Sequence, residues 1–508
     1  LGFKPGEAVA ICMPMTAEAV ALYLGVVWAG CAVVGIADSF AKDAVAMRLR
    51  VSGASALFTQ DVIQRGGKAL PLYARLSGLE LPRGTVVLPA SPAAGLRADL
   101  GSGAMAWEQF LAADPLRGLS KEPAAVSDAY GVTNILFSSG TTGEPKAIPW
   151  THVTPIRCGA DAWGHQDVRA GDVVAWPTNL GWMMGPWLIY AALLNDAAIA
   201  LYEGSPLGRE FGEFVSAAGV TMLGLVPSIA KAWRQSGCMH GLSWGSLRCF
   251  SSSGEASNPE DYHWLMARGG YVPVIEYCGG TEIGGGFLAG SMLLPNRPGA
   301  FSTPTLGTRI CILDGDSGRQ SVHSPWSPPA SGELAVVPPM LGMSQRLLNR
   351  DHGKVYYEGM PTLDGGGRVL RRHGDEFARL PRGVYCAQGR CDDTMNLGGI
   401  KVSSVEIERI CMKAGVEGVH EVAAVGLPTP GGGPERLVIF CVLSQKHDKQ
   451  ETSLREAFSK AVKEGLNPLF KVSMVVKIHN LPRTASNKVM RRVLRDSLEN
   501  PRTYPAKL

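Results

Sequence analysis

The sequence predicts an α/β protein: a large N-terminal domain of parallel-sheet α/β layers plus a small β-subdomain, followed by a small mobile C-terminal α+β domain. Its 508 residues exceed what one hydrophobic core normally serves, so more than one domain is expected. The 62 glycines favour a fold rich in tight βα turns over a helical bundle. Before residue 310, short apolar runs alternate with helical segments, the pattern of βαβ units. The expected strands read EAVAICM, AVVGIA, ALFTQ, GTVVLP, AIALYE, VTMLGLVP, RCFSSSG and PVIEYCGG.

The first unit contains an uncharged run, residues 19–37, that is long enough to raise the question of a membrane span. Thr16 can begin a helix over residues 16–29, and Gly30 can end it. The segment that follows, CAVVGIA, is rich in β-branched residues and is typical of a strand. We therefore predict a buried helix–turn–strand unit and no transmembrane span.

The pattern changes after residue 300. Residues 301–390 contain more turns and the short strand-like runs TRICILD, GELAVV, KVYYE and GVYCAQG, which indicate a small β-subdomain. A compact α/β module follows, with helices expected at 403–414 and 451–464 and strands at EVAAVGLP, ERLVIFCVL and MVVKIHNLP. We predict an N-terminal domain over 1–389 that lacks its own N-terminal part, because Leu1 directly precedes a strand-like run. The predicted C-terminal domain covers 390–508.

Composition narrows the possible partners. The formal net charge is +4, and no block of Lys and Arg forms the basic stripe typical of nucleic-acid binding. We expect no nucleic-acid partner. The 11 cysteines form no CxxC pair and no His/Cys cluster with zinc-finger spacing, so reduced thiols are expected.

A glycine- and hydroxyl-rich loop follows the apolar run GVTNILF. Residues 137–149 read FSSGTTGEPKAIP. Glycines let backbone amides approach an anion closely, hydroxyls donate hydrogen bonds, and Lys146 adds compact positive charge. The loop is not a Walker A motif, which needs four residues between its first Gly and Gly-Lys-Ser/Thr. It predicts a phosphate-binding loop of another kind.

Further polar groups follow later strands, where open α/β sheets bind ligands. SSSGEAS (251–257) and EYCGGTEIGGG (276–286) are both glycine-rich strand exits. The second carries Thr281-Glu282, a hydroxyl and a carboxylate suited to Mg²⁺. Asp375, in RRHGDEFARL, could accept hydrogen bonds from ribose hydroxyls, and Lys488 lies in a polar turn near the end of the chain.

Taken together, these motifs resemble the adenylate-forming superfamily, which contains acyl-CoA synthetases, luciferases and nonribosomal-peptide adenylation domains. The resemblance covers essentially the whole chain and is greatest to plant peroxisomal acyl-activating enzymes. Seven motifs in order make the match far more specific than any single one. They read SSGTTGEPK, SSGE, GGTE, HGD, GRCDD, GGIKVSSVEIE and PRTASNK.

The resemblance implies an ATP site. Its β- and γ-phosphates would be wrapped by the first loop, its adenine lined by the SSGE segment, and its ribose bound by residues of the HGD and GRCDD motifs. The residues implied are Ser138, Ser139, Gly140, Thr141, Thr142, Gly143 and Lys146 for the phosphates, Ser253, Gly254, Glu255 and Tyr277 for the adenine, and Asp375 and Arg390 for the ribose.

The resemblance also implies the catalytic parts. Thr281 would contact the α-phosphate, Glu282 would hold Mg²⁺, and Lys488 would reach the α-phosphate and the attacking carboxylate. Asp392 matches the hinge about which the C-terminal domain rotates. That rotation would remove Lys488 and bring the GGIKVSS loop to the site, with Gly398 and Gly399 beside the pantetheine arm of CoA.

The acyl pocket would be lined by the segment PTNLGWMMGPW (177–187), whose implied wall residues are Trp182, Met183, Met184 and Gly185. Acetate-specific relatives close this pocket with a Trp at the position of Gly279, so the resemblance implies room for a medium, long or aryl-substituted acyl group.

Two positions depart from the family pattern. The aromatic residue that stacks on adenine is replaced by Cys278, so either Tyr277 stacks through a shifted backbone or the adenine is held less tightly. Asn487 replaces the glycine before the catalytic lysine, and Asn tolerates the left-handed conformation.

The leading hypothesis is therefore an ATP-dependent carboxylate–CoA ligase that uses ATP, Mg²⁺ and CoA. The alternatives are an adenylating enzyme that passes the acyl group to a carrier protein, and a non-catalytic acyl- or nucleotide-binding protein on the same fold. The terminal Ala506-Lys507-Leu508 resembles the peroxisomal address Ser-Lys-Leu, so the peroxisomal import receptor is an expected partner. The expected location is the peroxisome, with the cytoplasm as the alternative.

Overall fold

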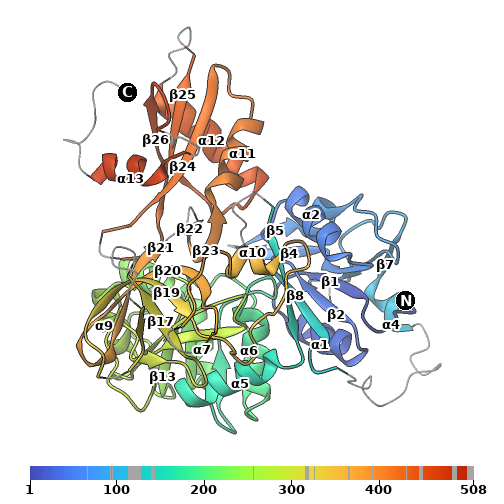
Figure 1. Cartoon of the computed structure of the whole chain (residues 1–508). Coiled ribbons are helices and arrows are strands. Elements are labelled where there is room, and N and C mark those ends of the chain that lie inside the picture. Colours follow the sequence, from blue (N-terminus) through green and yellow to red (C-terminus); the bar gives the residue numbers. More distant parts are fainter. Residues whose placement is uncertain are drawn as a thin grey trace.

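The structure is a computed structural model of the chain. Figure 1 shows two large α/β layers below and a separate C-terminal domain, coloured orange to red, above them. The β22–β23 hairpin lies at the junction. The described residues are 1–65, 67–91, 93, 95–112, 128–138, 144–255, 257–314, 320–324, 326–363, 367–390, 394–430, 432–444, 450–482 and 489–499.

The first layer is a seven-stranded sheet with the order β7-β6-β3-β1-β2-β8-β9. All neighbouring strands are parallel except β8 and β9, which form an antiparallel pair. Its strands are β1 (Ala8–Cys12), β2 (Ala32–Gly35), β3 (Ala56–Gln60), β6 (Thr85–Leu88), β7 (Ala104–Ala106), β8 (Val132–Ser138) and β9 (Lys146–Thr151). The accompanying elements are α1 (Ala17–Trp28), α2 (Lys42–Ser52), α3 (Leu72–Leu76), α4 (Trp107–Ala112) and the hairpin β4 (Val62–Arg65) and β5 (Lys68–Pro71).

The unit built on residues 19–37 forms as predicted. The Thr16 side chain caps α1 by accepting from the Ala19 backbone N–H at 3.3 Å. Gly30 follows the helix with φ +74°, a conformation that glycine adopts without steric cost, and β2 begins directly afterwards. Within the described part of the chain, no helix is long and apolar enough to cross a membrane.

The second layer is a seven-stranded sheet with the order β11-β10-β12-β13-β14-β15-β16, parallel as far as β14 and antiparallel beyond it. Its strands are β10 (Val173–Ala175), β11 (Ala198–Ala200), β12 (Met222–Leu225), β13 (Cys249–Ser252), β14 (Val274–Gly280), β15 (Gly285–Ala289) and β16 (Thr303–Pro304). Its helices are α5 (Thr154–His165), α6 (Met184–Leu193), α7 (Arg209–Ala217), α8 (Pro227–Ser236) and α9 (Pro259–Arg268).

One continuous hydrophobic core joins the two layers. It contains Ile11 from β1, Ile275 from β14 and the fully buried Trp187 of α6. Because this core is shared, the carboxyl ends of β8 and β14 are held at fixed positions relative to each other.

The β-subdomain is an antiparallel sheet with the order β18-β17-β19-β20-β21, which confirms the small β-subdomain predicted after residue 300. One expectation was wrong: KVYYE is not a strand. Its first residues form the end of a short helix that Asp351 caps by accepting from the Lys354 backbone N–H at 3.0 Å. The elements are β17 (Ile310–Leu313), β18 (Gln320–Val322), β19 (Ala330–Val336), α10 (His352–Tyr356), β20 (Arg371–Arg379), the 3₁₀ turn η2 (Pro381–Gly383) and β21 (Tyr385–Arg390).

The C-terminal module has its own core and a three-stranded sheet in which β24 and β25 are antiparallel and β25 and β26 are parallel. Its two expected helices and three expected strands are present, and β22, β23 and α13 are added to them. They are β22 (Thr394–Leu397), β23 (Ile400–Ser403), α11 (Ser404–Lys413), β24 (Val419–Leu427), β25 (Arg436–Leu443), α12 (Glu451–Gly465), β26 (Val472–Ile478) and α13 (Arg491–Glu499). The expected hinge, Asp392, lies outside the described residues.

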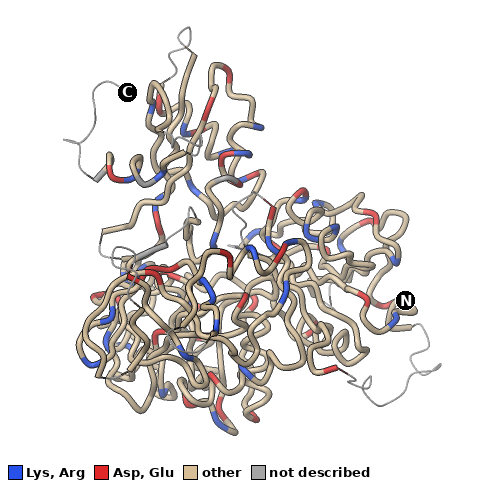
Figure 2. The backbone as a smooth tube through the Cα atoms, in the orientation of Figure 1, with Lys and Arg blue, Asp and Glu red and all other residues tan. Residues whose placement is uncertain are grey.

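Charged residues are spread over all parts of the described chain. Figure 2 shows Lys and Arg interspersed with Asp and Glu along the whole backbone. Electrostatics therefore act here through local groups, chiefly those that meet at the ends of β8, β14 and β20.

Candidate active site

The predicted phosphate loop begins and ends on a hairpin. β8 ends at Ser138 and β9 begins at Lys146, and these two residues are register partners in the antiparallel pair. Residues 139–143, which include the predicted contacts Ser139, Gly140, Thr141, Thr142 and Gly143, lie outside the described residues. The hairpin therefore fixes both ends of the loop on one edge of the first sheet.

Both ends meet a carboxylate from the second sheet. The Ser138 hydroxyl and the Lys146 ammonium each donate to Oε1 of Glu282 at 2.9 Å. Glu282 follows β14 directly, and its neighbour Thr281 is held by a hydrogen bond from Trp150 Nε1 to the Thr281 carbonyl at 2.8 Å. Residues separated by 144 positions in the chain thus form one cluster.

The Glu282 carboxylate is ionised in this setting. Burial alone would raise the pKa of Glu282, but Lys146, Lys401 and His373 together hold it well below its usual range. The Lys146 and Glu282 side chains are only 17% and 13% exposed, so this pair is poorly screened by solvent.

A second carboxylate lies on β20. His373 Nε2 is 3.1 Å from Oδ2 of Asp375, and Lys401 Nζ is 4.0 Å from the same oxygen. Arg390 is the register partner of Asp375 on β21, so the two predicted ribose contacts lie on neighbouring strands. A Cβ built on Gly280 would lie 3.2 Å from both Glu282 Oε2 and the His373 ring, so His373 is close to both carboxylates.

The predicted adenine segment follows β13. Glu255 accepts from the backbone N–H of Ser228 at 2.8 Å and from its hydroxyl at 3.1 Å, at the start of α8. Burial raises the pKa of Glu255 to about 6 against the opposing effect of the Ser228 hydrogen bonds. Ser253 and Gly254 lead into this residue, and Gly254 has φ +100°.

The C-terminal domain brings its predicted CoA loop to this segment. Gly398 and Gly399 form the turn between β22 and β23, with φ +65° and +79°. Two consecutive left-handed residues are the requirement of a tight hairpin turn, which explains the glycine pair. A Cβ on Gly399 would lie 3.6 Å from Glu255 Oε1, and Asn396 donates to the Gly254 carbonyl. The hairpin thus places Lys401 beside Asp375.

Tyr277 does not line this site. Its side chain is 1% exposed and points into the core shared by the two large sheets. The hydroxyl donates to Asp161 Oδ2 at 2.6 Å and accepts from Trp187 Nε1 at 3.1 Å. The irregularity in β14 falls between Cys278 and Gly279, after Tyr277, so it does not turn this ring towards a nucleotide. The alternative of Tyr277 stacking on adenine through a shifted backbone does not fit this arrangement.

The predicted acyl-pocket residues are divided among three environments. Trp182 lies at the domain interface, 5.4 Å from the Phe40 ring between centroids, and packs on the cores of both domains. Met183 and Met184 pack against the core shared by the two large sheets. A Cβ on Gly185 would lie 2.2 Å from the Asn179 carbonyl oxygen, so close backbone approach requires this glycine.

Gly279 has a comparable role. A Cβ built on it would lie 2.0 Å from the carbonyl oxygen of Gly285 on the adjacent strand β15. The glycine is therefore required by strand packing whatever the size of the acyl group. Room for a longer acyl chain therefore does not follow from Gly279.

Sequence reasoning missed three residues that belong to this cluster: His373, Lys401 and Tyr356. The first two lie inside motifs that were recognised, HGD and GGIKVSS, so the motif itself was an available signal. Tyr356 had none, because it lies in a segment expected to be a strand. Its hydroxyl is 3.2 Å from Glu282 Oε1 and 3.2 Å from Lys146 Nζ. Lys488 lies outside the described residues.

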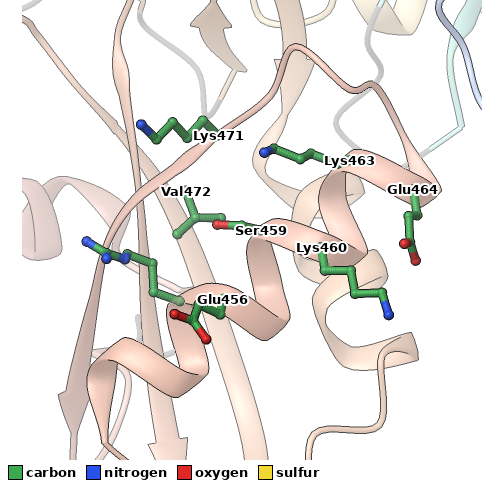
Figure 3. A pocket seen from close by; sticks show the side chains of 8 residues that line it. Glu456, Ser459, Lys460, Lys463, Glu464, Lys471 and Val472 are labelled. Atoms are coloured by element: carbon green, nitrogen blue, oxygen red, sulfur yellow. The ribbon is translucent and has the colours of Figure 1, made fainter.

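One hollow opens next to the site, and another lies away from it on the C-terminal domain. A cavity of about 240 Å³ lies between the domains and is bordered by Ser138, Trp182 and Lys401, so it opens next to the charged cluster. An open hollow of about 440 Å³ lies on the C-terminal domain between α12 and the start of β26 (Figure 3). Its lining contains both basic and acidic side chains and none of the predicted site residues. Its lining residues are Arg455, Glu456, Ser459, Lys460, Lys463, Glu464, Lys471 and Val472.

Among the described residues, no three His, Cys, Asp or Glu side chains lie close enough together to hold a metal ion alone. A single buried, ionised carboxylate such as Glu282 nevertheless suits Mg²⁺, which in nucleotide enzymes is bound by one or two carboxylates together with phosphate oxygens. The residues present therefore fit the predicted metal.

A two-sheet α/β body with a carboxylate, a lysine and a hydroxyl meeting beside a docked C-terminal domain defines a nucleotide-dependent ligase of the adenylate-forming kind. Comparison with known families agrees. Residues 1–343 match the AMP-binding enzyme family, and residues 406–488 match the AMP-binding enzyme C-terminal domain. The chain belongs to the AMP-binding enzyme family, and it is an ATP-dependent carboxylate–CoA ligase.

Individual relatives are similar over nearly the whole chain. The Arabidopsis thaliana protein named "Probable acyl-activating enzyme 17, peroxisomal" is 53% identical over 98% of this chain and 68% of its own length. The "Hexanoyl-CoA synthase" of Cannabis sativa is 51% identical with the same coverage. Among solved structures, the acetoacetyl-CoA synthetase of Streptomyces lividans has a TM-score of 0.69 at 25% identity, covering 98% of this chain and 74% of that one. The fold class predicted from the sequence is confirmed.

Proposed function

We propose that this ligase activates a medium-chain carboxylic acid, with long-chain and aryl-substituted acids as the alternatives. A relative with 51% identity is named a hexanoyl-CoA synthase, which supports a medium chain length. The ATP-dependent step is supported chiefly by the meeting of Ser138, Lys146 and Glu282 between the two sheets. The Ser138 hydroxyl and the Lys146 ammonium each lie 2.9 Å from Glu282 Oε1.

The first half-reaction joins two anions. The substrate carboxylate attacks the α-phosphorus of ATP, the bond to pyrophosphate breaks, and an acyl-adenylate forms. Ser138 and Lys146 bind the departing phosphates, and Thr281 and Lys488 face the α-phosphate. Positioning and charge neutralisation are the main contributions that a protein makes to such a reaction. Ser253, Gly254 and Glu255 hold the adenine, while Asp375 and Arg390 bind the ribose.

Glu282 would hold Mg²⁺, which when bound would neutralise negative charge on the phosphates. The rest of the charge neutralisation comes from the lysines. Lys146 is already beside Glu282, and Lys401 reaches within 4.0 Å of Asp375 from the C-terminal domain.

In the second half-reaction the thiol of CoA attacks the acyl carbon, and AMP leaves. We infer that the docked C-terminal domain described above serves this step, because Gly399 lies against Glu255 and the cavity of about 240 Å³ opens beside Ser138 and Lys401. Gly398 and Gly399 leave backbone available to the pantetheine arm. Rotation about Asp392 then exchanges this arrangement for one in which Lys488 serves adenylation.

A substrate panel tests the proposal. Acetate, hexanoate, octanoate, palmitate and 4-coumarate are compared by release of AMP and pyrophosphate, with and without CoA. The expected result is highest kcat/KM for hexanoate or octanoate, with pyrophosphate released without CoA and acyl-CoA formed only with it. Acetate as the best substrate would overturn the chain-length assignment. Lys488→Ala should lose adenylation while still binding ATP, and unchanged activity would remove Lys488 from the mechanism.

We also propose that the enzyme acts in the peroxisome and in fatty-acid metabolism, a proposal supported by two relatives that are named probable acyl-activating enzymes, peroxisomal. The terminal Ala506-Lys507-Leu508 would serve as the address for the import receptor; it lies outside the described residues. A fluorescent reporter that carries the C-terminal segment should enter peroxisomes, and removal of the last three residues should leave it in the cytosol. Cytosolic fluorescence with the intact segment would contradict the assignment.

A further inference from the structure

Tyr356 connects the two charged groups at the centre of the site. It is the last residue of α10, and its side chain is 6% exposed. The hydroxyl donates to Glu282 Oε1 at 3.2 Å and accepts from Lys146 Nζ at 3.2 Å. A tyrosine hydroxyl can do both at once, because it carries one donor and acceptor lone pairs.

The ring of Tyr356 has contacts of its own in addition to those of its hydroxyl. The guanidinium of Arg371, at the start of β20, lies 3.9 Å from the ring centroid, and the Lys146 ammonium lies 5.1 Å from it. The His352 ring makes an edge contact with a centroid distance of 5.1 Å. Arg371 is itself fully buried. Water therefore screens its contact with the Tyr356 ring only weakly, and this strengthens the cation–π interaction.

Glu282 Oε1 has three partners, Ser138, Lys146 and Tyr356, and their proposed roles in the reaction differ. Ser138 and Lys146 are phosphate ligands in the proposed function, so both must turn to the nucleotide. Tyr356 has no such role, and its ring is held by Arg371 whatever the other two side chains do. Because the Lys146 ammonium has three donors, Tyr356 can hold Glu282 and accept one Lys146 proton while Ser138 and the other Lys146 donors engage phosphate.

We propose that Tyr356 is a positioning residue for the adenylation half-reaction, holding Glu282 for the metal and Lys146 for the phosphates. This inference rests on the proposed function. It assigns Tyr356 no part in the thioester-forming step, which is carried out by the β22–β23 hairpin and CoA.

The test compares Tyr356→Phe with Tyr357→Phe. The first change removes the hydroxyl and keeps the ring that stacks on Arg371. The matched control removes the hydroxyl of the next residue, whose ring also makes an edge contact with His352 at a centroid distance of 5.7 Å. For Tyr356→Phe, kcat/KM for ATP in pyrophosphate release should fall by about 10- to 100-fold, the usual effect of losing a hydrogen bond to a charged group. Thioester formation from preformed acyl-adenylate should change less than about twofold, as should both steps in Tyr357→Phe.

A binding measurement distinguishes a failure of the positioning role from a failure of the proposed function. Affinity for α,β-methylene-ATP is measured by calorimetry with saturating and with limiting Mg²⁺. Tyr356→Phe should weaken binding by about tenfold and raise the Mg²⁺ concentration needed for half-saturation, with the thermal midpoint within about 2 °C of wild type. Wild-type affinity, or equal losses in both half-reactions, would refute the positioning role. A wild-type enzyme that binds the nucleotide but activates none of the acids would refute the proposed function instead.

Discussion

The Glu282 cluster and the interface of the C-terminal domain are built in opposite ways. The cluster joins the ends of β8, β9 and β14 with an ion pair whose side chains are 17% and 13% exposed. The interface instead includes the exposed pair Lys413–Asp43 at 3.3 Å, with side chains 71% and 80% exposed, and the longer pair Lys401–Asp375 at 4.0 Å. Hydrogen bonds from Asn467 to Ser39 at 3.2 Å and from Asn396 to the Gly254 carbonyl join them. The interface also encloses a cavity of about 240 Å³.

This difference suits the two tasks of the enzyme. A shielded ion pair fixes the geometry needed to neutralise charge in adenylation. An exposed pair contributes about 0–1 kcal/mol, so an interface of this kind can open and close without a large penalty.

Glu282→Gln should have the largest effect. It keeps the shape of the side chain but removes the charge that Lys146 faces in a shielded setting, which is a costly change at buried ion pairs. We expect the rate of pyrophosphate release to fall by about 100-fold or more, with thioester formation from supplied acyl-adenylate reduced less than tenfold. Rapid-quench kinetics of the two half-reactions would measure both. Equal losses in the two steps would show that the cluster is not specific to adenylation.

The contribution of Glu276 to the stability of the folded protein should depend on pH. Glu276 on β14 is buried and accepts from Ser257 Oγ at 2.8 Å and Gly299 N–H at 2.9 Å. Burial raises its pKa from 4.5 to about 7. A carboxyl whose folded pKa is raised contributes stability that is present below pH 4.5 and lost as pH rises through 7.

Glu276→Gln removes this titration. Between pH 4.5 and pH 8, the stability of the variant relative to wild type should therefore increase by up to about 3 kcal/mol, from 2.5 pKa units at 1.36 kcal/mol each. Urea unfolding at several pH values provides the measurement. A difference that stays constant across this range would mean that Glu276 does not titrate with a raised pKa.

Asn467→Ala should affect the other half-reaction. It removes the buried hydrogen bond to Ser39, an interaction worth about 1 kcal/mol, so docking should weaken by about fivefold. We expect thioester formation to slow by up to that factor while pyrophosphate release remains within about twofold of wild type. Slower adenylation with unchanged thioester formation would reverse the assignment of the docked state.

Lys413→Ala should have the smallest effect. Its exposed pair with Asp43 is screened by water and salt, so neither half-reaction should change by more than about twofold at 0.15 M salt. Steady-state kinetics at low and physiological salt would test this. A loss as large as that expected for Asn467→Ala would mean that surface charge contributes substantially to docking.

The sequence predicted that Ser138, Lys146 and Glu282 would meet, because each motif follows a strand and parallel strands deliver their carboxyl ends to one edge; their roles toward a nucleotide stay a prediction. It placed Tyr277 wrongly because side chains alternate along a strand, and a shift of one residue reverses the face. Tyr356 could not be found, because a hydrophobic pattern says nothing about which distant carboxylate a short helix will meet. The sequence also could not show why position 279 is a glycine. The atom that excludes a Cβ there is the Gly285 carbonyl oxygen on β15, and only the folded structure brings it close.

A reversible cross-link between positions 39 and 467 tests the central claim most directly. Ser39→Cys combined with Asn467→Cys puts thiols at two positions whose side chains meet at 3.2 Å between Asn467 Nδ2 and Ser39 Oγ. Because an Asn side chain reaches farther than a Cys, oxidation in the presence of a short dithiol that bridges the two thiols should hold the C-terminal domain in the docked arrangement. The same variant under reducing conditions is the control. The oxidised enzyme should convert supplied acyl-adenylate and CoA to acyl-CoA at a rate near that of the reduced enzyme, and should form no acyl-adenylate from acid and ATP. Normal pyrophosphate release from the oxidised enzyme would show that both half-reactions use one arrangement and would contradict the account.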